Sequence, residues 1–228
     1  MPTSLNSLRR LLEEHALRLV AKSERRNVPP LSEEADFRKI GERQANPGDM
    51  EHWETHFKGA NLRGLVLVNA KLADVDLGWT NLSGVYFNGA DLRRSDLTGA
   101  DLRAARMRGV NLSGAKLTFA QLGGTDFTGA DLTGIDFSQV DIRLSDLTGA
   151  NLRGAKFDGA DLDDAMLCWA DLSGASFRKA TLRRARLIGA DLSGAVFREA
   201  DLTGAVLGGA HTEGADFRDA LPAGLKFP

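Results

Sequence analysis

The chain has 228 residues, a formal net charge of −2 and ordinary shares of hydrophobic (43%) and charged (26%) residues, which argue against a disordered chain and a DNA-coating protein. No apolar run approaches the roughly 18 residues of a membrane span, and Arg9, Arg10, Glu13 and Glu14 interrupt the apolar core that a secretory signal needs. The single cysteine, Cys168, fits a reducing compartment, so we expect a cytoplasmic protein.

Residues 1–56 carry helical signals. Apolar residues recur at helical spacing over 5–20, and a proline pair at 29–30 ends that pattern. A second helical pattern begins near Ser32 and ends near residues 46–48. We therefore expect two short helices that form an N-terminal helical capping segment and cover the first coil of the region after residue 56.

Two histidines, His52 and His56, lie four residues apart at the end of this segment. The zincin signature needs a glutamate directly after the first histidine, and Trp53 occupies that position. The serines of the chain form no nucleophile elbow and have no evident acid–base partner. We therefore expect no metal site, no cofactor and no enzymatic activity.

From Phe57 onward a new pattern begins, with 33 pentads at intervals of five residues as far as Phe217. The central residue of each pentad is Leu, Phe, Met or Ile, except at Thr212, and alanine stands two residues before it in every repeat from Ala150 to Ala215. Such self-similarity marks a repeat architecture. We expect a repeat domain over 57–220 and a C-terminal cap over 221–228, where Pro222 interrupts the pattern.

A period of five fits neither a helix nor a flat strand. On a helix a step of five turns the chain by about 140° and scatters the leucines, and on a strand an odd step sends alternate leucines to opposite faces. A right-angle bend in each pentad instead points every central residue at one axis, so that four pentads close a coil of 20 residues. The central phenylalanines support this number, because all of them fall on two opposite faces of such a coil. They are Phe57, Phe137, Phe157, Phe177, Phe197 and Phe217 on one face, and Phe87 and Phe127 on the other.

The repeated A-[D/N]-L-x-G pattern, as in ADLTG at 130–134, is similar to that of the pentapeptide-repeat family. The resemblance implies an all-β solenoid, a right-handed quadrilateral β-helix with short stacked strands, whose roughly eight coils at about 4.8 Å each make a rod about 38 Å long. The aspartates before the central residues, such as Asp91 and Asp131, are expected to bond backbone N–H groups at turns rather than to take part in catalysis.

Charge is banded along the repeats. Residues 91–116 hold six basic and three acidic residues, 126–171 hold ten acidic and three basic, and 178–199 hold six basic and two acidic. Turn-forming aspartates with solubilising arginines would explain this, and so would a partner-binding acidic band. The acidic band comprises Asp126, Asp131, Asp136, Asp141, Asp146, Asp161, Asp163 and Asp164.

One face also carries apolar residues at outward positions. This apolar strip comprises Tyr86, Met166, Trp169, Ile188 and Val206, with Val66, Val68 and Cys168 on the same face. Outward positions of the other faces hold few large apolar side chains, mainly Trp79, Phe119, Leu144 and Val196. A clustered strip indicates a contact surface. A homodimer, the N-terminal helices and a separate protein partner could each cover it.

These features are compatible with two classes of function. The first is a non-catalytic rigid interaction or scaffold module that binds a protein partner through a solenoid face. The second is a DNA mimic that binds DNA gyrase or another type II topoisomerase, as some members of the family do in quinolone resistance. We expect no direct contact with nucleic acid or membrane.

Charge density limits the second class. B-DNA carries about one charge per 1.7 Å, so a mimic about 38 Å long needs about 22 net negative charges. Residues 57–228 hold 21 acidic and 20 basic residues, so mimicry along the whole length fails. Residues 126–171 carry ten acidic against three basic residues, which leaves mimicry by the acidic band alone.

Overall fold

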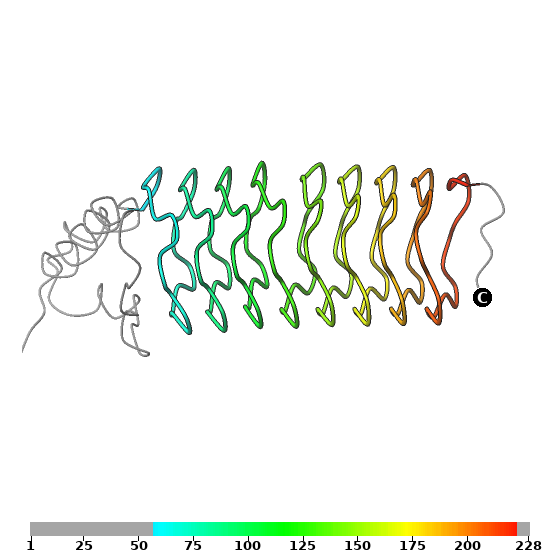
Figure 1. Cartoon of the computed structure of the whole chain (residues 1–228), viewed down its shortest axis with the longest axis horizontal. Coiled ribbons are helices and arrows are strands. Elements are labelled where there is room, and N and C mark those ends of the chain that lie inside the picture. Colours follow the sequence, from blue (N-terminus) through cyan, green and yellow to red (C-terminus); the bar gives the residue numbers. More distant parts are fainter. Residues whose placement is uncertain (1–56, 223–228) are drawn as a thin grey trace, which may run out of the picture.

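The computed structural model describes residues 57–222, which form one continuous solenoid (Figure 1). The predicted helices within 1–56, both His52 and His56, and the predicted cap beyond Pro222 lie outside the described residues. Within 57–222 there is no helix of the length and hydrophobicity that a membrane span requires.

Residues twenty apart in the sequence pair as parallel β-bridges. The bridging residue is the one before each central residue, from Asn61, which pairs with Asn81, to Asp201, which pairs with Leu221. Two hydrogen bonds flank each bridge, as where Leu82 N–H donates to Asp101 O at 2.7 Å and Asp101 N–H donates to Thr80 O at 3.0 Å. The structure thus has the twenty-residue coil that the phenylalanine spacing predicts, and each strand is a single bridging residue.

Each pentad ends in a tight turn. The carbonyl of the central residue accepts a hydrogen bond from the N–H three residues later, as from Ala130 to Phe127 at 2.9 Å. The residue two after the central one, here called the corner residue, has a positive φ, such as 64° at Gly129. A positive φ at the third residue of the turn defines type II, and glycine adopts it without steric cost. Four turns per coil give four faces, which we name by one central residue each: the Leu132, Phe137, Ile142 and Leu167 faces, in chain order.

The core is a column of central side chains, with the small residues two positions earlier packed beside them. Leu132 and Ala130 are typical, and both are buried. Where serine or threonine replaces the alanine, its hydroxyl donates to a backbone carbonyl, as from Thr125 to Leu102 O at 2.9 Å and from Ser145 to Leu122 O at 2.8 Å. Within 57–222 every buried side-chain polar atom has a hydrogen-bond partner.

Phenylalanine rings stack along the Phe137 face. The rings of Phe157 and Phe177 lie 4.7 Å apart at an angle of 2°, and those of Phe177 and Phe197 lie 4.6 Å apart at 3°. The opposite face supplies leucines at this level, such as Leu167 and Leu187. Large rings on one side are therefore matched by smaller side chains on the other, as close packing of a narrow core requires.

Candidate interaction surfaces

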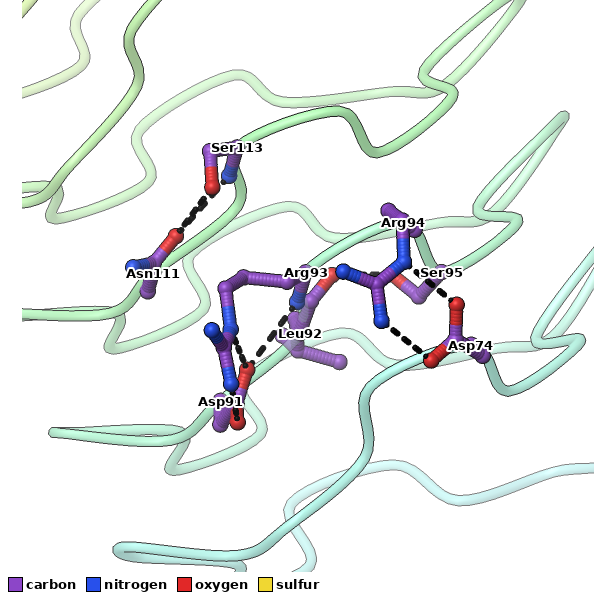
Figure 2. Close-up of polar contacts among 8 residues, drawn as sticks. All are labelled: Asp74, Asp91, Leu92, Arg93, Arg94, Ser95, Asn111 and Ser113. Carbon is purple, nitrogen blue, oxygen red and sulfur yellow. Dashed lines mark hydrogen bonds and ion pairs between the residues drawn. The ribbon is translucent and has the colours of Figure 1, made fainter.

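The aspartates and asparagines of the bridging positions hold the turns that come directly after them. Thr133 donates two hydrogen bonds to Asp131 Oδ1, from its N–H at 3.2 Å and its hydroxyl at 2.7 Å. Ser113 makes the same pair of bonds to Asn111 Oδ1, at 3.0 and 2.8 Å (Figure 2). The prediction that these side chains bond nearby backbone N–H groups is confirmed.

Arginines clamp several of these carboxylates. Figure 2 shows Arg93 donating to Asp91 through Nε at 2.8 Å and Nη2 at 2.7 Å, within one turn. It also shows Arg94 reaching Asp74 of the preceding coil, with both distances at 2.7 Å. The hydrogen bond from Arg93 lowers the pKa of Asp91 below its ordinary value. Part of the acidic surface is therefore neutralised by the chain itself.

The acidic band is spread over all four faces of the rod. Asp131 lies on the Leu132 face, Asp136 on the Phe137 face and Asp141 on the Ile142 face, while Asp126 and Asp146 bridge each other on the Leu167 face. The structure therefore does not gather the band into one patch.

Half of the band is paired with arginine. Asp126 contacts Arg108 at 2.6 Å, and Asp164 contacts Arg184 at 2.6 Å. Arg143 lies 2.7 Å from Asp141 and 3.4 Å from Asp161. Among residues 57–222, no ion pair involves the remaining four members of the band, which are Asp131, Asp136, Asp146 and Asp163.

The apolar strip is discontinuous. Tyr86 is half-buried, and the Arg106 guanidinium covers its ring at 4.7 Å from the centroid. Along the same line of bridges, Arg106, Asp126 and Asp146 separate Tyr86 from Met166. The rest of the strip lies within residues 166–206, where Arg186 stands between Met166 and Val206 in the line of bridges, and we call it the Trp169 patch. It comprises Met166, Trp169, Ile188 and Val206.

Trp169 is the most prominent member of this patch. It is a corner residue with φ 60°, and 69% of it is exposed. Its ring lies against Gly189 of the next coil, where a Cβ would overlap the indole. The backbone N–H of Trp169 donates to Ile188 O at 2.9 Å, which fixes the backbone beneath the ring. Cys168 is half-buried, with its thiol 3.7 Å from the Arg186 carbonyl oxygen.

A family comparison agrees with this architecture. The family model described as pentapeptide repeats matches the chain in eight copies, within residues 53–89, 70–109, 105–143, 145–184, 160–198 and 180–219. The chain belongs to the pentapeptide-repeat family. No curated protein matches this pentapeptide-repeat protein.

Solved structures of the family resemble the chain loosely. HetL, a pentapeptide repeat protein involved in heterocyst differentiation regulation from the cyanobacterium Nostoc sp. strain PCC 7120, is 28% identical over 80% of this chain and 99% of its own, with a TM-score of 0.34. QnrB1, a plasmid-mediated fluoroquinolone resistance protein, is 23% identical over 67% of this chain and 84% of its own, with a TM-score of 0.43.

The sequence of this pentapeptide-repeat protein places Trp79, Phe119 and Leu144 at outward positions, but the left-handed backbone conformation of these residues was not predicted. Three further large apolar residues occupy corners with positive φ and are strongly exposed: Trp79 at 58%, Phe119 at 73% and Leu144 at 69%. Their signal in the sequence is a bulky residue two places after a central residue, where glycine is usual. Residues 57–222 contain no group of three His, Cys, Asp or Glu side chains that could hold a metal ion.

Proposed function

We propose that this protein is a non-catalytic, rigid interaction module that binds a protein partner through the Trp169 patch on the Leu167 face. The observation that carries the proposal is the state of Trp169, which is exposed, apolar and held in a left-handed backbone conformation. For a residue with a side chain, that conformation costs roughly 1–2 kcal/mol. With 69% of the residue exposed, burial within this chain offsets little of that cost.

The neighbours of Trp169 support the same conclusion. Met166 and Val206 are 36% and 46% exposed, and Arg186 lies between them in the line of bridges. Tryptophan and arginine are enriched among the residues that dominate binding energy at protein interfaces, and methionine is enriched at interfaces generally. Because the ladder already fixes their backbone, binding loses less conformational entropy than it would on a flexible loop.

The test begins with a photo-crosslinking amino acid placed at position 169, and at position 79 as a control, in the protein expressed in its own cells. Trp79 is a matched control because it is also an exposed corner tryptophan that lies against a glycine, Gly99. We expect a partner to be crosslinked from position 169 only. Trp169→Ala should then weaken binding of that purified partner at least tenfold and Trp79→Ala should not. Binding that survives both Trp169→Ala and Ile188→Ala would refute the proposal, and crosslinking between two copies would identify a homodimer.

The acidic band supports a second candidate, local mimicry of DNA toward a type II topoisomerase such as DNA gyrase. Two of its bridges, Asp126 with Asp146 and Asp141 with Asp161, place like charges directly opposite each other. Each of these aspartates holds the turn after it, and their pairing places two carboxylates at one position, which raises the local negative charge that a DNA mimic needs. The test is a gyrase supercoiling assay, with and without a quinolone. Inhibition or drug protection that disappears in the Asp131→Asn, Asp141→Asn and Asp161→Asn triple variant would support it, and no effect at high concentration would exclude gyrase.

Four further expectations, of which only the first comes from the family, stay predictions. They are the right-handed winding, the roughly eight coils, the helical capping segment over 1–56 and the cytoplasmic location. The winding and the number of coils determine how the faces of the rod are arranged, and the capping segment and the location determine which partners can reach those faces.

A further inference from the structure

Within residues 58–222, the ladder of hydrogen bonds between coils is interrupted at one place. From Lys58 onward, the N–H groups of corner, central and bridging residues bond to adjacent coils wherever the described residues supply the partner, with one exception. Five N–H groups that should join residues 114–120 to residues 133–141 make no such bond. They belong to Gly114, Leu117, Phe119, Asp136 and Asp141. We call this interruption the seam.

The seam is centred on the Phe137 face. Lys116 and Asp136 are twenty residues apart but form no bridge, although Asp96 bridges Lys116 and Asp136 bridges Lys156. The layers on either side are intact, since Leu97 N–H donates to Lys116 O at 2.8 Å and Phe137 N–H donates to Lys156 O at 2.7 Å. In Figure 1 the green coils at the upper edge of the rod are more widely separated than their neighbours, while the lower edge keeps an even spacing.

The core explains why the seam occurs here. The side chain of Phe127 enters the core from the opposite face. Phe127 is ten residues after Leu117 and ten before Phe137, so along the axis of the rod its ring lies between their side chains. Its ring meets that of Phe137 edge-on, with centroids 6.3 Å apart and an angle of 62°. Phe137 is in turn tilted by 18° from Phe157, whereas the rings farther along are parallel within 4°. Two large rings thus share a layer of the core that elsewhere holds one, and overpacking forces the backbone to shift.

A second phenylalanine on the Leu167 face shows that one ring alone is not sufficient. Phe87 enters between Leu77 and Leu97 in the same way. There Leu77 N–H donates to Asp96 O at 2.7 Å and Asp96 N–H donates to Val75 O at 3.0 Å, so the ladder is closed. The seam therefore needs a phenylalanine on both faces, which in 57–222 happens only where Phe127 meets Phe137.

We propose that the seam is a hinge between two rigid stacks of the solenoid, so that the rigidity of the proposed module belongs to each stack and not to the whole rod. The stack up to Ala115 and the stack from Asp136 each keep a complete ladder, and the Leu167 face joins them without a break, as where Met107 N–H donates to Asp126 O at 2.7 Å. Opening the seam on the Phe137 face bends the rod about the opposite, Leu167 face and makes that face concave. Tyr86 and the Trp169 patch lie on that face, on either side of the hinge. The hinge itself does not rest on the proposed function.

Hydrogen–deuterium exchange of the full-length protein tests the hinge, because an unbonded amide exchanges without prior opening of the ladder. We expect the amides of Leu117, Phe119 and Asp136 to exchange at least tenfold faster than those of Leu97, Gly99 and Lys116, which hold the equivalent positions one coil earlier and are bonded. Phe127→Leu should slow the seam amides at least tenfold. Phe87→Leu is the matched control, with the same change on the same face, and should leave them unchanged. Seam amides as protected as Leu97 in the wild type would overturn the proposal.

Spin-label distances provide a second readout that does not depend on exchange. Labels at positions 98 and 178, in a Cys168→Ser background, span the seam, and labels at 138 and 218 span as many residues without crossing it. We expect a broader distance distribution for the first pair, which narrows in Phe127→Leu, and no change for the second pair. Equal widths for the two pairs in the wild-type protein would show a rigid rod and refute the hinge.

Discussion

Replacing Phe177 by leucine tests how much the ring stack contributes to stability. Phe177 is fully buried, and its ring lies 4.7 Å from that of Phe157 and 4.6 Å from that of Phe197. Leucine is compatible with this position, because Leu77 and Leu97 occupy it in other coils of the same face. The substitution therefore removes ring contacts without changing the backbone that the coil requires.

The expected magnitude comes from those two contacts. Each aromatic pair contributes about 0.5–1.5 kcal/mol beyond the area it buries. Phe177→Leu should therefore lower the free energy of unfolding by about 1–3 kcal/mol through stacking alone. For a chain of this size that corresponds to a fall in Tm of about 2–12 °C.

The assay is thermal and urea unfolding followed by circular dichroism, with Phe87→Leu as the reference. Phe87 is equally buried, but within 57–222 no other ring contacts it. Its replacement therefore loses only the free energy of burying the larger side chain, with no stacking contribution. The difference between the two variants isolates the stack. A Phe87→Leu variant that loses as much stability as Phe177→Leu would refute the reasoning.

Two further predictions concern the aspartates. Hydrogen bonds from Thr203 lower the pKa of Asp201 to about 2, and hydrogen bonds from Arg93 and Arg143 lower those of Asp91 and Asp141. The unfolded chain then binds protons more readily than the folded one, so stability is complete above about pH 4 and falls toward pH 2. A Tm that stays constant from pH 5 to pH 2 at fixed salt would contradict this. Asp131→Asn should preserve the hydrogen bonds donated by Thr133, whereas Asp131→Ala should lower the free energy of unfolding by about 1 kcal/mol. Equal Tm values for the two variants would show that these bonds contribute nothing to stability.

The regular part of the structure could be predicted from the sequence because each position of the pentad has one role. The spacing of the central phenylalanines gives the twenty-residue coil, and Gly134 and its equivalents mark the corners. The turn bonds of Asp131 are the ordinary chemistry of a short carboxylate before a turn. The corners and the turn bonds depend only on residues within one pentad, and the same residue types recur along the repeats, so the sequence is sufficient to predict them.

The departures could not be predicted in the same way, because they depend on which coil a residue occupies. Tyr86 and Met166 share a face, but three charged bridging residues lie between them, so membership of a face did not mean contact. The pairing of Arg94 with Asp74 joins two coils and has no local signal. The conflict between Phe127 and Phe137 needs the axial level of each ring as well as its face.

The cost of each departure indicates where function lies in a repeat protein. The regular pentad has glycine at the corner, leucine at the centre and aspartate or asparagine at the bridge, as in residues 130–134 and 150–154. Trp169 and Phe119 add backbone strain at exposed corners, the bridge between Asp126 and Asp146 adds repulsion, and Phe127 removes five backbone hydrogen bonds from the ladder. Within residues 57–222 the strain at the exposed corners is not offset by burial and the repulsion is not offset by ion pairing of both charges, whereas Phe127 is fully buried in the core. A binding partner would offset the first two, and a rod that must change its curvature to fit that partner would explain the third.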